Sequence, residues 1–245
     1  MFRLPVSGLR LDVRPPGGAD DLMLLEAPVL DRAFALALLE RLSEGAKVET
    51  LCIHDFEAAL LHLHSRMFGP SISADAHCRC GERVDIAFRS ADFLRHRAPK
   101  RPRNLTARDG EGWYGIGGEA AQFRLPTIGD QIAVATEADP AKALAARCVR
   151  GGIATARIER AMAALAPVLS GPIEGRCPHC GEVLTVKFDI PSFVLGELRV
   201  QASQVCEHVH VLAAHYHWSE KEILALPNWR RQHYVDMAVA ERGGG

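Results

Sequence analysis

The 245-residue chain has no long apolar run, no excess of either charge and only 6% aromatic residues. None of its apolar stretches approaches the roughly 20 residues that a helix needs to cross a bilayer. The formal net charge of −1 gives no overall attraction to nucleic acid or to an acidic membrane. The first residues lack the apolar core and the cleavage site of a secretory signal. We therefore expect a globular protein of the cytoplasm, without a membrane partner.

Sequence patterns of common catalytic sites are also missing. The chain has no Gly-rich phosphate loop, no Gly-x-Ser-x-Gly turn and no His-Glu-x-x-His helix. Its eleven histidines are not matched by facing carboxylates at the spacing of a helical metal site. We expect no enzymatic activity and no small-molecule substrate.

Cysteine is the residue type that does form a pattern. Seven cysteines without a secretory signal argue against a disulfide framework. The run Cys-Pro-His-Cys-Gly-Glu at 177–182 is typical of a zinc knuckle, and Cys-Arg-Cys-Gly-Glu at 78–82 is an imperfect copy. Since tetrahedral Zn²⁺ takes four ligands, we predict one structural Zn²⁺ bound by Cys78, Cys80, Cys177 and Cys180.

Two alternatives to this ligand set remain open. A constant offset of 100 places His77, rather than Cys78, opposite Cys177, so His77 is an alternative ligand. The first turn is also compatible with a degenerate knuckle that binds no metal.

The same offset indicates an internal duplication. Val84, Ile86 and Phe88 correspond to Leu184, Val186 and Phe188. Phe-Arg-Leu-Pro occurs at 2–5 and again at 123–126, and Gly-Pro occurs at 69–70 and at 171–172. With helical patterns at 31–45, 54–68 and 154–169, these matches predict an α+β fold of two pseudo-symmetric halves, each containing helices, a knuckle and a strand.

The predicted organisation has four parts. Residues 1–94 form the first half, 95–120 a basic Pro/Gly-rich linker, 121–195 the second half and 196–245 a C-terminal helical hairpin. The first 30 residues are expected to be extended, with a turn at 15–18. The linker is either a solvated connector or a basic contact surface carrying Arg95, Arg97, Lys100, Arg101, Arg103 and Arg108.

The C-terminal part is predicted to be helical. One long helix is expected at 191–217, Ser219 and Glu222 form a capping box, and Pro227 begins the last helix. Aromatic and arginine side chains are enriched at protein interfaces. We therefore predict a partner-binding surface formed by Trp229, Arg230, Arg231 and Tyr234.

The order of these motifs resembles one family. A Cys-Pro-x-Cys-Gly turn leads to a strand, a long helix, His-Tyr-His-Trp-Ser-Glu-Lys-Glu at 215–222 and an arginine-rich helix with Tyr234. This order, strongest over about 175–237, is similar to the baseplate assembly proteins of contractile-tailed phages. That family is related to the T-even-phage baseplate hub assembly proteins and occurs also in phage-tail-like injection systems. Leu125-Pro126 and the run Arg-Pro-Pro-Gly-Gly-Ala-Asp-Asp-Leu at 14–22 extend a weaker likeness.

The resemblance implies a non-enzymatic assembly factor or minor hub component. Its partners would be baseplate or hub proteins, and its location the cytoplasm of the bacterial host or the finished tail particle. A zinc-ribbon adaptor that binds nucleic acid through residues 95–108 is the alternative, although the net charge does not favour nucleic acid as a partner. A metal-dependent hydrolase is a third hypothesis, which would require an open coordination position.

Overall fold

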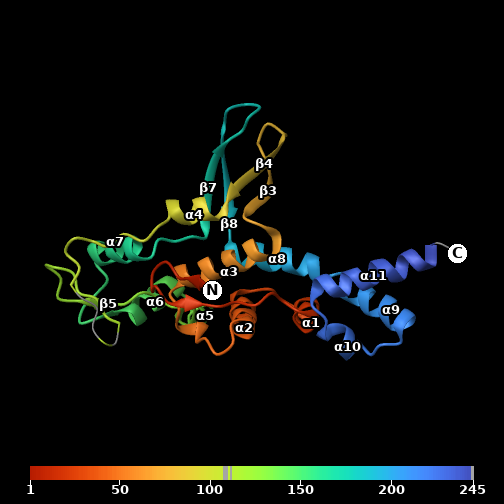
Figure 1. The fold of residues 1–245 in the computed structure, drawn as a ribbon. Helices are drawn as coiled ribbons and strands as arrows, with labels where there is room; N and C mark the ends of the chain where they lie inside the picture. The colour runs from red at the N-terminus through yellow and green to blue at the C-terminus, as the bar shows by residue number, and fades with distance from the viewer. Residues whose placement is uncertain (107–109, 111, 244–245) are drawn as a thin grey trace. The chain divides into compact units, whose positions relative to one another are not determined.

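The computed structural model describes residues 1–106, 110 and 112–243 and combines helices with short antiparallel sheets (Figure 1). The described helices are α1 (Gly18–Glu26), α2 (Arg32–Leu42), α3 (Ile53–Phe68), α4 (Ser90–His96), α5 (Ile128–Ala133), α6 (Pro140–Cys148), α7 (Ala156–Leu165), α8 (Ile190–Ala202), α9 (Val205–Tyr216), α10 (Glu220–Ala225) and α11 (Asn228–Gly243), with a 3-10 turn at Val48–Thr50. The strands are β1 (Phe2–Arg3), β2 (Arg10–Leu11), β3 (Ser71–His77), β4 (Arg83–Arg89), β5 (Gln122–Phe123), β6 (Val149–Arg150), β7 (Gly171–Arg176) and β8 (Val183–Phe188). The predicted α+β class is confirmed.

The chain divides into two compact units that do not follow the predicted parts. Unit 1 contains Met1–Val13 and Ser43–Ile190, and unit 2 contains Arg14–Leu42 and Pro191–Gly245. The described helices include none that is both long and apolar enough to cross a lipid bilayer.

Helix α3 is the centre of unit 1. Its apolar side chains from Phe56 to Leu63 are excluded from solvent, among them Leu60 and Leu61, whereas Phe68 at its end is exposed. Its buried acids are satisfied by hydrogen bonds, because Asp55 accepts from the backbone N–H groups of Val6 and Ser7 and Glu57 accepts from Ser170. A helix buried on all sides explains why its sequence shows a broad apolar pattern.

A second cluster in unit 1 includes part of the predicted linker. Ile116 and Phe123 are buried with Ile158 of α7, and Leu105 and Tyr114 pack against them. Isolated β-bridges join Leu105 to Ile116 and Tyr114 to Phe123. The segment 95–120 is therefore not a solvated connector throughout; Arg108, which the sequence assigned to its basic surface, lies outside the described residues.

Two β-hairpins in unit 1 carry the cysteine turns. β3 pairs with β4 and β7 pairs with β8, both antiparallel. Figure 1 shows the two hairpins projecting side by side from the helices of this unit. At their bases Phe88 packs edge-on against Phe188, with ring centroids 5.6 Å apart, and Phe93 packs against both.

Unit 2 contains a helical core. Helices α9, α10 and α11 bury Val211, Leu212, Ile223, Val235 and Ala238 between them. Ser219 caps α10 together with Glu222, as predicted from the capping box.

Two expectations for unit 2 are wrong. Residues 18–26 are helical rather than extended, because Gly17 is an N-cap whose backbone N–H donates to Asp20. The long helix expected at 191–217 is divided at Ser203–Gln204 into α8 and α9.

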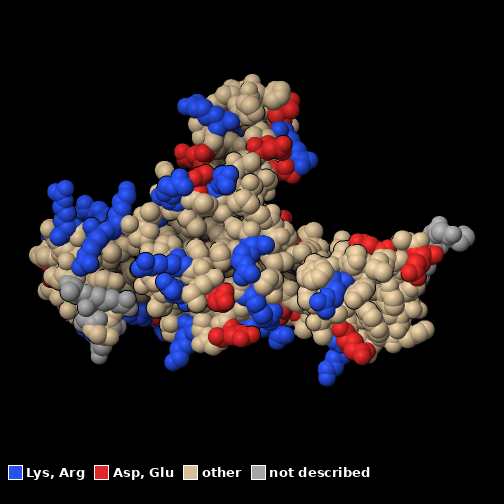
Figure 2. Space-filling model, in the orientation of Figure 1, with Lys and Arg blue, Asp and Glu red and all other residues tan. Residues whose placement is uncertain are grey.

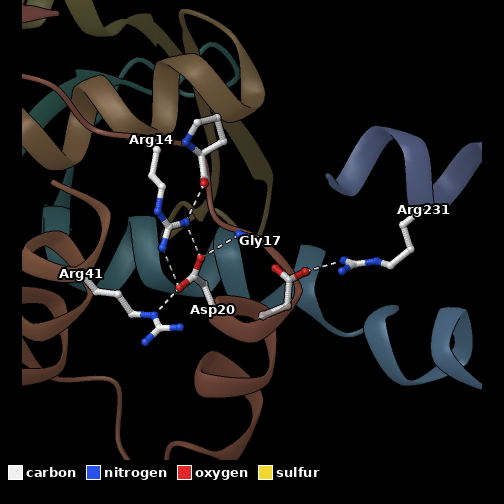
Figure 3. A network of polar contacts seen from close by, with 7 residues as sticks. Arg14, Gly17, Asp20, Arg41 and Arg231 are labelled. Carbon is white, nitrogen blue, oxygen red and sulfur yellow. Dashed lines mark hydrogen bonds and ion pairs between the residues drawn. The ribbon is translucent and has the colours of Figure 1, made fainter. Parts of the chain in front are cut away.

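A buried carboxylate connects the two N-terminal helices of unit 2 (Figure 3). Asp20 is 1% exposed and accepts hydrogen bonds from Nη1 of Arg14 at 2.6 Å and Nε of Arg41 at 2.5 Å. The backbone N–H of Gly17 donates to the same carboxylate at 2.8 Å, and the N–H of Arg14 donates to the carbonyl of Leu42 at 2.9 Å. One carboxylate thus caps α1 and ties it to the end of α2.

Unit 1 contains the same set of contacts. Asp130 accepts from Arg124 at 2.5 and 2.8 Å, from Nε of Arg147 at 3.3 Å and from the N–H of Thr127 at 3.0 Å. The N–H of Arg124 donates to the carbonyl of Cys148 at 2.9 Å. This carboxylate caps α5 and ties it to the end of α6.

Candidate metal centre

The four predicted cysteine ligands lie together at the tips of the two hairpins. Each follows or precedes a strand by one or a few residues, so strand pairing fixes where the turns begin and end. The sulfurs of Cys78, Cys80, Cys177 and Cys180 all lie within 4.8 Å of one another. Residues about 100 apart in sequence are brought to one point, as the sequence predicted.

The two turns have matching hydrogen bonds. The N–H of Cys78 donates to the carbonyl of Glu82 and the N–H of Cys177 donates to the carbonyl of Glu182, each at 2.9 Å. Gly81 and Gly181 have φ angles of 92° and 74°, a conformation that a Cβ would disfavour. Glycine after the second cysteine is therefore required by the turn itself.

The sulfur spacing fits tetrahedral coordination. The Sγ atoms of Cys78 and Cys180 are 3.6 Å apart, and those of Cys80 and Cys177 are 3.9 Å apart. Four sulfurs around one ion at metal–sulfur bonds of ~2.3 Å would be about 3.8 Å apart. A disulfide would require a separation of ~2.05 Å, and all four cysteines are free thiols.

The thiols influence one another's ionisation. The backbone N–H of Cys180 donates to the sulfur of Cys177 and, with the N–H of His179, lowers the pKa of Cys177 to about 7. The N–H of Glu182 lowers the pKa of Cys180, but desolvation and the neighbouring thiols outweigh it and raise that pKa to about 12. Four thiols this close cannot all ionise without a cation. A divalent ion would reverse this balance, so metal binding should release protons.

His77 does not belong to the cluster. It is the last residue of β3, pairs with Arg83 across the hairpin and is exposed. The constant offset led to the wrong equivalence, because the first turn is one residue shorter and the missing residue lies between its two cysteines. Cys78, not His77, makes the hydrogen bond that Cys177 makes in the second turn.

The cluster has limited solvent access. Cys78 and Cys177 are 7% and 2% exposed and pack against Val84 and Leu184. Cys80 and Cys180 are the exposed members at the tips of the turns. Among the described residues, the cluster consists of four cysteine sulfurs and includes no oxygen or nitrogen ligand.

The predicted partner-binding residues divide into two groups. Trp229 is 69% exposed, and the guanidinium of Arg230 lies 5.4 Å from its ring centroid. Arg231 is only 1% exposed, so its assignment to an exposed surface is wrong. Burial is tolerated because Arg231 pairs with Asp21 at 2.5 Å (Figure 3).

Tyr234 is half-buried in unit 2. Its ring packs edge-on against Trp218 at 5.2 Å and against Tyr216 at 6.0 Å. Most of this aromatic group therefore holds α9 and α11 together, and Trp229 is its exposed neighbour in sequence.

The two Arg–Asp–Arg networks were not anticipated from the sequence. The repeat of Phe-Arg-Leu-Pro at 2–5 and 123–126 pairs Arg124 with Arg3, which makes no such contact with an acid among the described residues. The pattern that could have revealed them is Arg-x-Pro with an Asp four residues after the proline, at 14–20 and 124–130. Arg14 donates to Asp20 as Arg124 donates to Asp130.

No family model, no curated protein sequence and no solved structure matches this chain.

Proposed function

We propose that this protein is a non-enzymatic assembly factor or minor component of a contractile phage-tail-like baseplate or hub, built around a structural Zn²⁺. The observation that carries the proposal is the closed set of four cysteine sulfurs from two hairpins. Tetrahedral all-sulfur sites favour Zn²⁺ or an iron–sulfur cluster, and four thiolates leave Zn²⁺ no open position for a substrate. Such a site stabilises a fold and does not by itself perform chemistry.

The proposal includes an internal duplication. Each copy would run from an Arg–Asp–Arg network through a helix to a cysteine hairpin and a following helix. In support, the network at Asp20 and the network at Asp130 make the same four kinds of contact, and each hairpin is followed by a helix, α4 or α8. One Zn²⁺ bound by two cysteines from each copy would join the two copies. This would explain why neither copy has four ligands of its own.

The partner surface would be the exposed face of α11 at Trp229 and Arg230. An exposed tryptophan beside an arginine is a composition typical of interface hot spots. The baseplate or hub partner and the location, in the host cytoplasm or in the tail particle, rest on the motif order that the chain shares with the baseplate assembly family. The C-terminal helices would present this surface to the partner.

The test combines metal analysis with tail assembly in cells that carry the complete tail gene set. Purified, reduced protein should contain about one Zn²⁺ per chain. Trp229→Ala with Arg230→Glu should abolish tail assembly and co-purification of baseplate proteins, while melting temperature and metal content stay near wild type.

A control replaces an exposed apolar residue by Ala and an exposed cation by Glu elsewhere on unit 2. Val200, which is 72% exposed, and the exposed Lys221 can be changed in Val200→Ala with Lys221→Glu. This control should assemble tails normally. Normal assembly by the Trp229 variant would exclude α11 as the partner surface, and steeply salt-dependent DNA binding by the wild type would favour the nucleic-acid adaptor instead.

A further inference from the structure

A hollow lined by cations lies in unit 1, beside α7 and the segment that follows α4. Its volume is about 500 Å³, and its charged lining residues are Lys100, Arg101, Arg157 and Arg160. Figure 2 shows Lys and Arg side chains gathering over α7, at the left of the view. We call this feature the basic hollow.

Main-chain contacts build the basic hollow. The N–H of Lys100 donates to the carbonyl of Ala164 at 2.7 Å, and the guanidinium of Arg97 donates to the carbonyl of Val168 at 3.2 Å. The segment after α4 therefore runs alongside α7. This arrangement brings Lys100 and Arg101 to the side of the helix that carries Arg157 and Arg160.

The guanidinium of Arg157 lies beside the loop at Gly118. A Cβ on Gly118, whose φ is +87°, would come within 2.7 Å of Nη1 of Arg157. The guanidinium thus lies directly against a backbone that has no side chain at this point.

The four cations of the basic hollow have no acidic partner among the described residues. Arginines elsewhere in unit 1 do pair with carboxylates, as Arg83 does with Asp75 and Arg124 with Asp130. Arg157 also lies in the first turn of α7, where the helix dipole disfavours a cation. The arrangement costs stability in the free protein, and a bound anion would offset that cost.

We propose that the basic hollow binds an acidic segment of a partner protein, with carboxylates on the four cations and an aliphatic side chain between them. The floor supports the aliphatic part, because Ile116 and Ala161 are both buried apolar residues that line the hollow. Arginine guanidinium groups suit carboxylates, since they can donate two parallel hydrogen bonds.

Nucleic acid fits the basic hollow less well. No aromatic side chain lies among the residues that line it in the described part of the chain, so bases would have no stacking platform. Four cations would neutralise only a few phosphates, and the net charge of −1 adds no long-range attraction. None of these residues belongs to the metal centre or to α11, so this proposal and the proposed function can fail separately.

The experiment measures binding of the full chain to a short fluorescein-labelled peptide in which Glu flanks Leu, by fluorescence anisotropy. A peptide with Lys in place of Glu and a single-stranded oligonucleotide of the same net charge serve as comparison probes. We expect saturable binding of the Glu–Leu peptide that weakens with salt. The double variant Arg101→Glu with Arg160→Glu should weaken it at least about tenfold, because two charge-assisted contacts become repulsive.

Both substituted residues are exposed and have no acidic partner among the described residues, and Arg160 donates only to the carbonyl of Ala156 within its own helix, so the fold should be retained. The matched control is Lys47→Glu with Lys187→Glu, which makes the same charge change at two exposed positions of unit 1 outside the basic hollow. It should bind like wild type. The proposal is overturned by absence of saturable peptide binding, by equal weakening in the control, or by tighter binding of the oligonucleotide than of the Glu–Leu peptide.

Discussion

The turns of the two cysteine hairpins differ by one residue, and that residue lies between the two cysteines. Cys78 and Cys80 are separated by Arg79 alone, whereas two residues separate Cys177 from Cys180. Both turns still close with the same hydrogen bond from the first cysteine to the glutamate carbonyl. A turn of five residues and a turn of six residues therefore both place two sulfurs in the cluster.

The two Arg–Asp–Arg networks are alike in their contacts but belong to different units. One lies in unit 2 and the other in unit 1. A carboxylate that caps one helix and pairs with an arginine on the next is a local device, since all its members lie within 30 residues of one another. Such a network can therefore form in either unit, whatever core surrounds it.

Substituting a cysteine of either turn should have the largest effect on metal content and stability. Cys78→Ser in the first turn and Cys177→Ser in the second should have the same result if both turns contribute equally. We expect each to lose most of its bound metal and to lower the melting temperature by ~10 °C or more, because ligand loss removes folding free energy. Elemental analysis and thermal unfolding under reducing conditions measure this.

Cys206→Ser is the control for the cysteine variants, since Cys206 is exposed and lies on α9. It should keep full metal content. If Cys78→Ser retains metal while Cys177→Ser does not, the first turn is a degenerate knuckle and the shared site is wrong.

The two carboxylates of the networks should differ in strength. Asp130→Asn is expected to cost about 2–3 kcal/mol and Asp20→Asn about 1–2 kcal/mol, less than for a fully buried pair because the arginines are partly exposed. Asp130 has the larger effect because both guanidinium contacts from Arg124 are short, at 2.5 and 2.8 Å, and because its pKa is held further below the ordinary value, whereas deeper burial of Asp20 offsets more of its pairing. Urea unfolding of each variant measures the difference, and a larger loss for Asp20→Asn would contradict it.

The same variants should also change how the free energy of unfolding depends on pH. Burial alone would raise the pKa of Asp20 and of Asp130, but the arginines and the capping N–H groups outweigh it and hold both below 3.8. Each carboxylate therefore contributes stability that is fully present above about pH 4 and is lost as the pH falls through the folded-state pKa. The stability difference between wild type and variant should be constant from neutral pH to about pH 4 and should shrink only below it. A difference that disappears at higher pH would mean that these carboxylates are not the responsible groups.

The sequence predicted what depends on residue type at fixed spacing. The α+β class, the capping box at Ser219 and the ligand set of four cysteines follow from local chemistry, and the structure contains them. Equivalence between distant segments was less predictable. Phe-Arg-Leu-Pro at 2–5 matches 123–126 in letters, yet the hydrogen bonds of Arg124 are repeated by Arg14, whose neighbours are Val13 and Pro15.

The burial of charged side chains was the second feature that the sequence did not predict. Arg231 was assigned to a surface because it follows Trp229 and Arg230, but Asp21, its partner, is 210 residues away in sequence. No local pattern encodes such a pair. The helix at 18–26 was not predicted because Pro15, Pro16, Gly17 and Gly18 suggest a turn, although glycine is also a common N-cap residue and Asp20 follows it at the capping-box position.

The smallest effect is expected for His77→Ala, which tests whether His77 or Cys78 is the ligand that corresponds to Cys177. If the offset of 100 held through the turn, His77 would be the ligand opposite Cys177 and His77→Ala would remove metal. In the structure His77 is an exposed strand residue outside the cluster, so His77→Ala should keep full metal content and change stability by less than ~0.5 kcal/mol. Cys78→Ala is the matched comparison on the adjacent residue and should lose metal, because it removes one of four sulfurs. Metal loss in His77→Ala with retention in Cys78→Ala would reverse the assignment, and the first hairpin would then have to bind the ion through imidazole nitrogen.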